Sequence, residues 1–155
     1  MQHAQLNIKE YFVDEISIKA NPDYQRKEPA KNNVKVDHDI RRNNSNPLEF
    51  MIQMTIIANN EKTDFCKADY CVILKLTGFF EFAAGTDEET INRMIGPSGL
   101  SILYGIARGI VAQGTANCWH GKLILPSLNF IEILRERAEQ LTKTAARPKK
   151  KAKAV

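Results

Sequence analysis

Thiol, imidazole and carboxylate side chains could support a metal site or acid–base chemistry in this 155-residue chain. Cys118 and His120 flank Trp119 and are the only thiol and imidazole that lie close in sequence. A structural zinc site needs about four ligands, usually from two such clusters. Cys66 and Cys71 are five residues apart, so on a continuous strand they point to opposite faces. We therefore expect no metal site and no cofactor.

Four carboxylates, Asp14, Glu15, Asp37 and Asp39, could form a paired-carboxylate site. Strand alternation places Asp37 and Asp39 on one face, which is more typical of a solvated surface than of an acid–base pair. The sequence has no phosphate-binding loop, dinucleotide fingerprint or nucleophile elbow. We expect a protein that is not an enzyme.

The composition is that of one soluble globular domain, with 43% hydrophobic and 26% charged residues. No apolar run approaches the ~18 residues of a membrane span. The N-terminus lacks a basic and apolar secretion signal, and three irregularly spaced cysteines do not indicate a disulfide framework. These features predict a cytoplasmic protein without membrane insertion.

The net charge of +4 arises from the C-terminus. After Glu139 the sequence contains six basic residues and no acidic one. Without these six, 16 Lys and Arg face 18 Asp and Glu, so the rest of the chain has a net charge of −2. We expect residues 1–142 to form the domain and 143–155 to be a basic, disordered tail.

Alternating apolar and polar residues predict strands at 8–19, 34–40, 48–58 and 65–76. In the first, Phe12, Ile16 and Ile18 share a face. Gly78 is predicted to mark a bulge or turn before a last strand segment at 79–83.

Helical patterns follow the strands. Residues 85–90 resemble a helix entry, but Gly96-Pro97 is expected to break that helix, so the main helix begins near Ser98. A second helix begins after Asn129, an N-cap with Glu132 in the capping-box position. Strands first and helices afterwards predict an α+β fold, an antiparallel four-stranded sheet with two helices packed on one face.

Two features leave alternatives open. Gly105 and Gly109 each cost ~1 kcal/mol of helix propensity, which close packing against another subunit or against the second helix would offset. The loop that contains Trp119 and residues 123–125 is unusually apolar. It either covers the core or lines a groove for a partner.

The chain resembles the SecB family of export chaperones over about residues 8–135. The most specific part is Leu103-Tyr104, Ala107-Arg108 and Asn129-Phe130, which follows the family's L-[FY]-P-Y-A-R, a fixed gap and N-F. Residues 14–17 and 34–37 resemble the family's K-D-I-S and V-K-L-D segments. The sequence departs from the family at Gly105-Ile106 and in the loop at 116–121.

This resemblance implies an ATP-independent holdase, a chaperone that binds unfolded polypeptides in apolar grooves of a homotetramer. Carried over by position, the client-binding groove comprises Val34, Val36, Phe65, Leu123 and Leu125, with Trp119 added by proximity. The assembly helix implies an oligomer interface at Leu103, Gly105, Ile106, Gly109 and Ile110.

The partners implied by the resemblance differ in how well this sequence fits them. Glu15 corresponds to one acidic position that contacts the SecA translocase, but Lys19 and Ala68 replace two others, and the tail is basic. SecA binding is therefore uncertain, and a chaperone dedicated to a toxin–antitoxin system is an alternative. A nucleic-acid-associated protein acting through the basic tail is less favoured, because six cations without aromatic residues cannot read a sequence.

Overall fold

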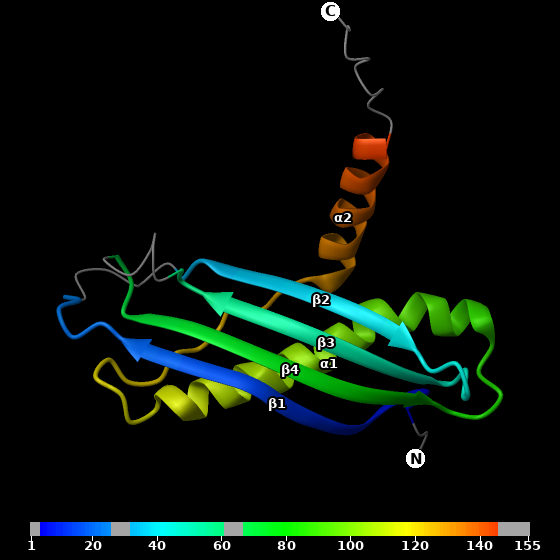
Figure 1. Ribbon diagram of the computed structural model, residues 1–155, viewed down its shortest axis with the longest axis horizontal. Helices are drawn as coiled ribbons and strands as arrows, with labels where there is room; N and C mark the ends of the chain where they lie inside the picture. The colour runs from blue at the N-terminus through cyan, green and yellow to red at the C-terminus, as the bar shows by residue number, and fades with distance from the viewer. Residues whose placement is uncertain (1–3, 26–31, 61–66, 146–155) are drawn as a thin grey trace, which may run out of the picture.

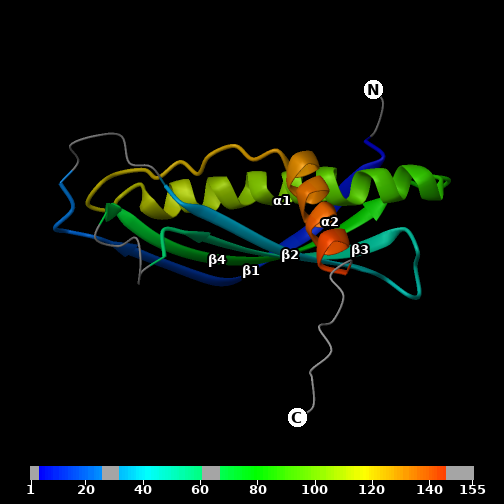
Figure 2. The ribbon, with the colours of Figure 1, turned by 90° about the horizontal axis from the view of Figure 1, so that it is seen from above.

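The computed structural model describes residues 4–25, 32–60 and 67–145. A four-stranded antiparallel sheet in the order β1-β4-β3-β2 lies against one long helix (Figure 1). The elements are β1 (Leu6–Ala20), β2 (Val34–Arg42), β3 (Glu49–Ala58), β4 (Tyr70–Phe82), α1 (Glu88–Thr115) and α2 (Phe130–Ala145). Figure 2 shows α1 covering one face of the sheet and leaving the other face open. The predicted α+β fold is confirmed.

The hydrophobic core lies between α1 and the inner face of the central strands. Even-numbered residues of β3 and β4 point toward α1, and most of them have almost no exposed surface. Their period of two fixes the register, because a slip by one residue would turn this set to solvent. The helix contributes Ile91, Leu100, Leu103, Ala107 and Val111 to the same core.

The predicted faces of β1 are wrong in part, because two bulges interrupt its pairing with β4. Register shifts occur between Ile8 and Glu10 and between Val13 and Glu15. Each bulge adds a residue to β1, which reverses the side-chain alternation beyond it. As a result Phe12 lies on the open face, where its ring packs edge-on against Phe79 at 6.2 Å, and does not share a face with Ile18.

The bulge or turn predicted at Gly78 is also wrong, since β4 runs through this position without interruption. Glycine is used here because the helix packs closely on the strand. A Cβ atom at Gly78 would lie 2.9 Å from the Phe80 ring and 3.0 Å from Cδ1 of Leu103.

The predicted helix break at Gly96-Pro97 is wrong as well. Helix α1 begins at the N-cap Asp87 and continues through Pro97 to Thr115. An internal proline costs ~3 kcal/mol of helix propensity. Buried residues on both sides of the proline, including Ile95 and Leu100, anchor the two halves to the same sheet and offset this cost.

Among the described residues, only α1 is long and apolar enough to cross a membrane by length and composition. The buried core helix of a soluble protein meets the same criteria. Its apolar side here packs on the sheet, with Leu103 and Val111 fully buried.

The second helix begins as predicted, with the Oδ1 atom of Asn129 accepting the N–H groups of Ile131 (3.2 Å) and Glu132 (3.5 Å). Burial along α2 is uneven. Phe130 is buried, but Leu141 is 66% exposed. After its first turns α2 leaves α1 and extends past the β2 edge of the sheet (Figures 1 and 2). Much of its apolar side is therefore not covered by its own chain.

His38 lies on the inner face of β2, opposite Met54 of β3. Partial burial lowers its pKa, with a contribution from Arg137 of α2, while Asp37 and Asp39 oppose the shift. A lowered pKa means that the folded protein binds fewer protons than the unfolded chain. This contribution to stability is complete above the unfolded pKa of ~6.5 and decreases as the pH falls below it.

We expect the wild type to lose more stability between pH 7.5 and pH 5.5 than a His38→Gln variant. Guanidinium unfolding curves of both proteins at the two pH values measure the difference. Equal losses would show that the His38 environment does not favour the neutral imidazole.

Candidate functional site

The connection between α1 and α2, residues 116–129, is fastened to α1 along its length. The Leu123 N–H donates to Oγ1 of Thr115 (2.8 Å), and Nε of Arg108 donates to the Leu125 carbonyl (3.0 Å). The Tyr104 hydroxyl donates to the Pro126 carbonyl (2.8 Å). The connection is therefore an ordered layer over the core.

Leu123 and Leu125, two predicted groove residues, are buried in this layer, with exposed fractions of 4% and 0%. Their side chains belong to the hydrophobic core and cannot contact a client in this conformation. The extended backbone alternates, so Ile124 between them points outward and is 55% exposed. The segment therefore covers the core with one side, which is one of the two alternatives left open by the sequence, and exposes an aliphatic residue on the other side.

The other predicted groove residues occupy different environments. Val34 and Val36 lie on the inner face of β2 and are partly buried against the core. Trp119 is 81% exposed on the turn after α1. Phe65 lies outside the described residues.

A hollow of about 540 Å³ lies between α1 and the start of α2. Its apolar lining comes from Pro97 and Ile102 of α1 and from Leu128, Phe130 and Ile131 near α2. Ile131 is 68% exposed. This site could not be predicted from the sequence, because the hollow depends on how α2 leaves α1.

The predicted oligomer-interface residues fall on two sides of α1. Gly105 and Gly109 lie on its outer side, where a Cβ atom would have no heavy atom within 4 Å. Ile106 and Ile110 are partly buried. Leu103 is fully buried against the sheet near Gly78, so it is a core residue of the single chain.

The acidic residues considered for catalysis do not converge. Asp14 and Glu15 lie on β1, and Asp37 and Asp39 on β2, the two outer strands, which two further strands separate by about 14 Å. Asp14 accepts the Thr77 hydroxyl (2.6 Å), and Glu15 is paired with Lys75. The acidic residues of β1 and those of β2 therefore do not meet at one site.

The thiol and imidazole groups also lack a shared centre. Nε2 of His120 is bound to the Asn21 carbonyl (2.6 Å), and Cys118 contacts the Gly114 carbonyl (3.6 Å). Among residues 4–25, 32–60 and 67–145, no three His, Cys, Asp or Glu side chains are grouped as a metal site would require. Cys66 lies outside these ranges.

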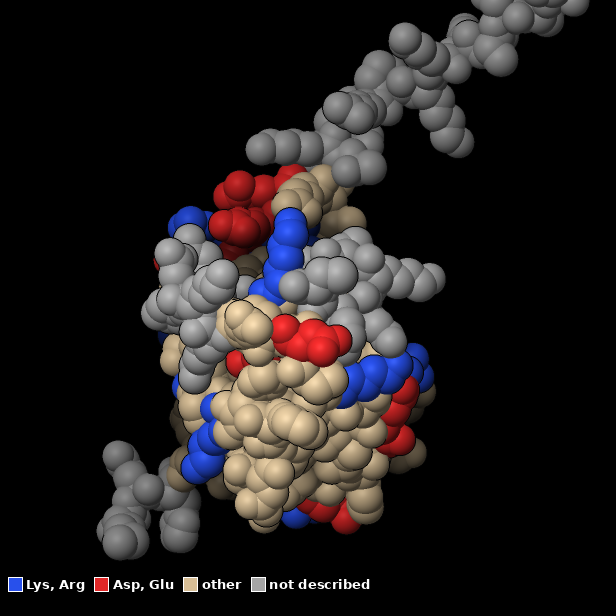
Figure 3. All heavy atoms as spheres, turned by 90° about the vertical axis from the view of Figure 1, so that its left-hand side faces the viewer, with Lys and Arg blue, Asp and Glu red and all other residues tan. Residues whose placement is uncertain are grey.

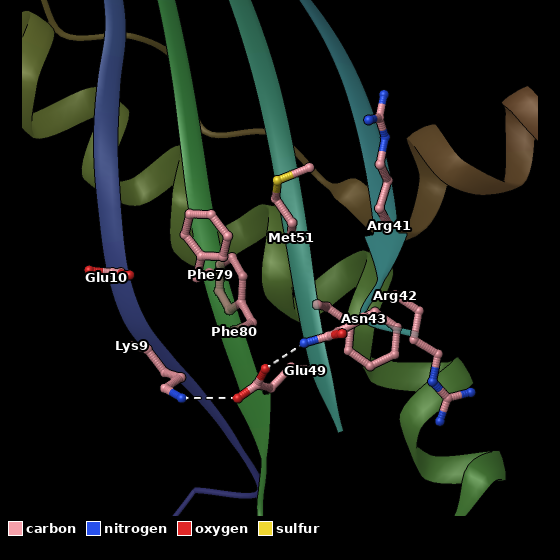
Figure 4. A pocket seen from close by; sticks show the side chains of 10 residues that line it. Lys9, Glu10, Arg41, Arg42, Asn43, Glu49, Met51, Phe79 and Phe80 are labelled. Atoms are coloured by element: carbon pink, nitrogen blue, oxygen red, sulfur yellow. Dashed lines mark hydrogen bonds and ion pairs between the residues drawn. The ribbon is translucent and has the colours of Figure 1, made fainter. Parts of the chain in front are cut away.

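A second hollow, of about 350 Å³, lies at one end of the open face of the sheet (Figure 4). Phe79 and Met51 contribute apolar side chains. Glu49 joins Lys9 (3.1 Å) and Asn43 (2.8 Å) across it. The ion pair raises the pKa of Lys9 and lowers that of Glu49. The charges of Lys9 and Glu49 therefore compensate each other within the hollow.

Comparisons with known proteins identify the family. The model of the SecB family, described as preprotein translocase subunit SecB, matches residues 1–141. This chain belongs to the SecB family. Membership of this family supports a chaperone role for the protein.

Individual proteins are also similar to this chain in sequence or in fold. An uncharacterized protein of Methanocaldococcus jannaschii is 29% identical over 150 residues, which cover 91% of this chain and 94% of that protein. A Mycobacterium tuberculosis SecB-like chaperone, solved with a peptide from the HigA1 antitoxin, has a similar fold. Its TM-score is 0.60 at 13% identity, over 80% of this chain and 91% of that one. A Streptococcus agalactiae protein of unknown function has a TM-score of 0.41 at 12% identity, over 79% and 97% of the two chains.

The residues that carried the resemblance to SecB meet in space. Tyr104 packs edge-on against Phe130, with 5.5 Å between ring centroids, and Asn129 caps the helix that Phe130 begins. Arg108 and Tyr104 hold the connection that separates the two halves of the motif. The motif therefore fastens the α1–α2 connection.

Proposed function

We propose that this SecB-family protein is an ATP-independent holdase that binds unfolded polypeptides in the cytoplasm. The observation that carries the proposal is a set of large apolar side chains exposed on a well-fastened layer. Trp119 and Ile124 lie on the connection, and Ile131 borders the hollow beside α2. We propose Val34 and Val36, which are partly buried on the inner face of β2, as further client contacts together with Phe65, and Leu123 and Leu125 as the buried support of the connection.

The binding energy comes from removal of apolar surface from water, worth about 25 cal/mol per Å². Each site is small, so one contact with a client is weak. Several sites on one oligomer act together through their high effective concentration. Clients that keep apolar segments exposed for longer are therefore bound without a sequence code.

We propose a homotetramer in which the outer side of α1 packs against other subunits. Gly105 and Gly109 leave space for close approach of another backbone, and Ile106 and Ile110 supply apolar contact. Leu103 takes part only indirectly, by fixing α1 on the sheet.

We propose a general client-holding role, which protein export and antitoxin protection would share. The similar M. tuberculosis chaperone was solved with an antitoxin peptide, which supports testing such a client. We propose Glu15 as a translocase contact, although its ion pair with Lys75 partly neutralises its negative charge. Tight, salt-sensitive binding of purified SecA would favour export.

The test is suppression of aggregation of a chemically unfolded model protein, without nucleotide and at stoichiometric concentration. We expect suppression by the full chain and by a variant that lacks residues 146–155. We expect nucleic-acid binding, if any, to disappear in the shortened variant, because the basic residues there carry that charge. Loss of suppression on removal of the tail would contradict the proposed location of the client sites.

A further inference from the structure

Trp119 is the only tryptophan of the chain and its most exposed large apolar residue among those described. It lies on the turn at 118–121 that follows α1. An exposed indole on a loose loop would lose conformational freedom on binding. The contacts on either side of Trp119 therefore determine how well it can serve as an anchor.

The Tyr70 hydroxyl is the centre of these contacts. It donates to the Gly121 carbonyl (2.7 Å) and accepts the backbone N–H of His120 (3.0 Å). A single hydroxyl group therefore both donates and accepts a hydrogen bond, and its two partners are the two residues that follow Trp119. The Tyr70 ring is buried at the start of β4, so the hydroxyl is fixed by the sheet.

His120 adds a second attachment. Its Nε2 atom lies 2.6 Å from the Asn21 carbonyl, and because a carbonyl only accepts, Nε2 carries the proton. The imidazole ring lies between the rings of Tyr24 and Tyr70, edge-on to each with 5.7 Å between centroids. Asn21 itself is buried, and its N–H donates to the Asp69 carbonyl (2.8 Å).

The turn is thus fixed to Asn21, directly after the outer strand β1, and to Tyr70 of the central strand β4, in addition to its link to α1. Figure 3 views the end of the molecule where this turn, the end of β1 and the start of β4 lie. The lower part of the described surface in this view is mostly uncharged, while an acidic and a basic side chain lie near its middle and further charged ones lie at its edges. Trp119 itself is 81% exposed, so most of its indole is available to an apolar segment of a client.

We propose that Tyr70 and His120 are positioning residues that hold Trp119 as a preformed anchor for large apolar side chains of an extended polypeptide. This inference rests on the proposed client-holding function. A rigid aromatic side chain loses less entropy on binding, which is why such residues dominate many interfaces.

Tyr70→Phe tests the inference, because it removes the hydroxyl and leaves the ring in the core. Tyr104→Phe is the matched control, since its hydroxyl bonds the same connection at Pro126, away from the turn. The probe is a fluorescein-labelled synthetic peptide that carries Phe and Leu but no tryptophan. We expect Tyr70→Phe to weaken peptide binding about two- to tenfold and Tyr104→Phe to weaken it less.

The time-resolved fluorescence anisotropy of Trp119 reports the positioning directly. We expect the wild type and Tyr104→Phe to show only slow decay, and Tyr70→Phe to add a fast local component. His120→Ala should add a similar component. Absence of a fast component in both Tyr70→Phe and His120→Ala would overturn the positioning role.

A double-mutant cycle with Trp119→Ala tests whether Tyr70 acts through the indole. We expect Trp119→Ala to weaken peptide binding and to abolish any further effect of Tyr70→Phe. An equal effect of Tyr70→Phe in both backgrounds would overturn the inference. Unchanged binding by Trp119→Ala would also overturn it, while leaving the holdase intact. A wild type that neither binds the peptide nor suppresses aggregation would instead remove the proposed function, and the anchor role with it.

Discussion

Replacement of Leu125 by alanine is expected to lower the free energy of unfolding by about 2–5 kcal/mol, the range for a large aliphatic residue removed from a core. Leu125 has no exposed surface and belongs to the core cluster. The matched change Ile124→Ala, one residue earlier and 55% exposed, is expected to cost less than about 1 kcal/mol. Urea unfolding of the two variants measures both values.

The same pair separates folding from function. At temperatures where both variants are folded, we expect Ile124→Ala to suppress client aggregation less well than Leu125→Ala. The reason is that only Ile124 offers its side chain to a client in this conformation. Near-equal unfolding free energies for the two variants would contradict the packed connection.

The double substitution Gly105→Ala and Gly109→Ala is expected to have opposite effects on the helix and on the oligomer. Alanine is better than glycine in a helix by about 1 kcal/mol at each position, and a Cβ atom meets no atom of its own chain. If the outer side of α1 packs closely on another subunit, the two methyl groups push the helices apart. The oligomer should then dissociate at higher protein concentration than the wild type does.

Light scattering coupled to size exclusion, over a dilution series, measures this dissociation. Ser101→Ala is the control, because it introduces alanine at another exposed position of α1 and leaves both glycines unchanged. An unchanged oligomer with increased thermal stability would show that this side of α1 faces solvent. The assembly would then have to use another surface.

The sequence predicted the sheet better than the helices for a physical reason. Strand alternation in β3 and β4 is continuous, and burial of one face allows only one register. Neither glycine nor proline marks the bulges of β1, so the sequence did not indicate the face on which Phe12 lies. The break expected at Pro97 reflects local propensity, which tertiary packing of α1 outweighs.

The candidate site was only partly predictable. The apolar character of residues 123–125 was evident, but their alternation becomes visible only when the connection is seen to be extended over the core. Tyr70 lies about 50 residues before His120, and no spacing rule links the two. The hollow beside α2 depends on the angle at which that helix departs.

The central claim, that an oligomer of this chain holds unfolded polypeptides without nucleotide, is tested most directly by isolating the complex. A chemically unfolded client is diluted into the protein, and the mixture is analysed by size exclusion with light scattering. We predict a stable complex of oligomer and unfolded client, formed without ATP and absent when a folded form of the same client is used. A correctly folded oligomer that forms no such complex with several unfolded clients would contradict the account.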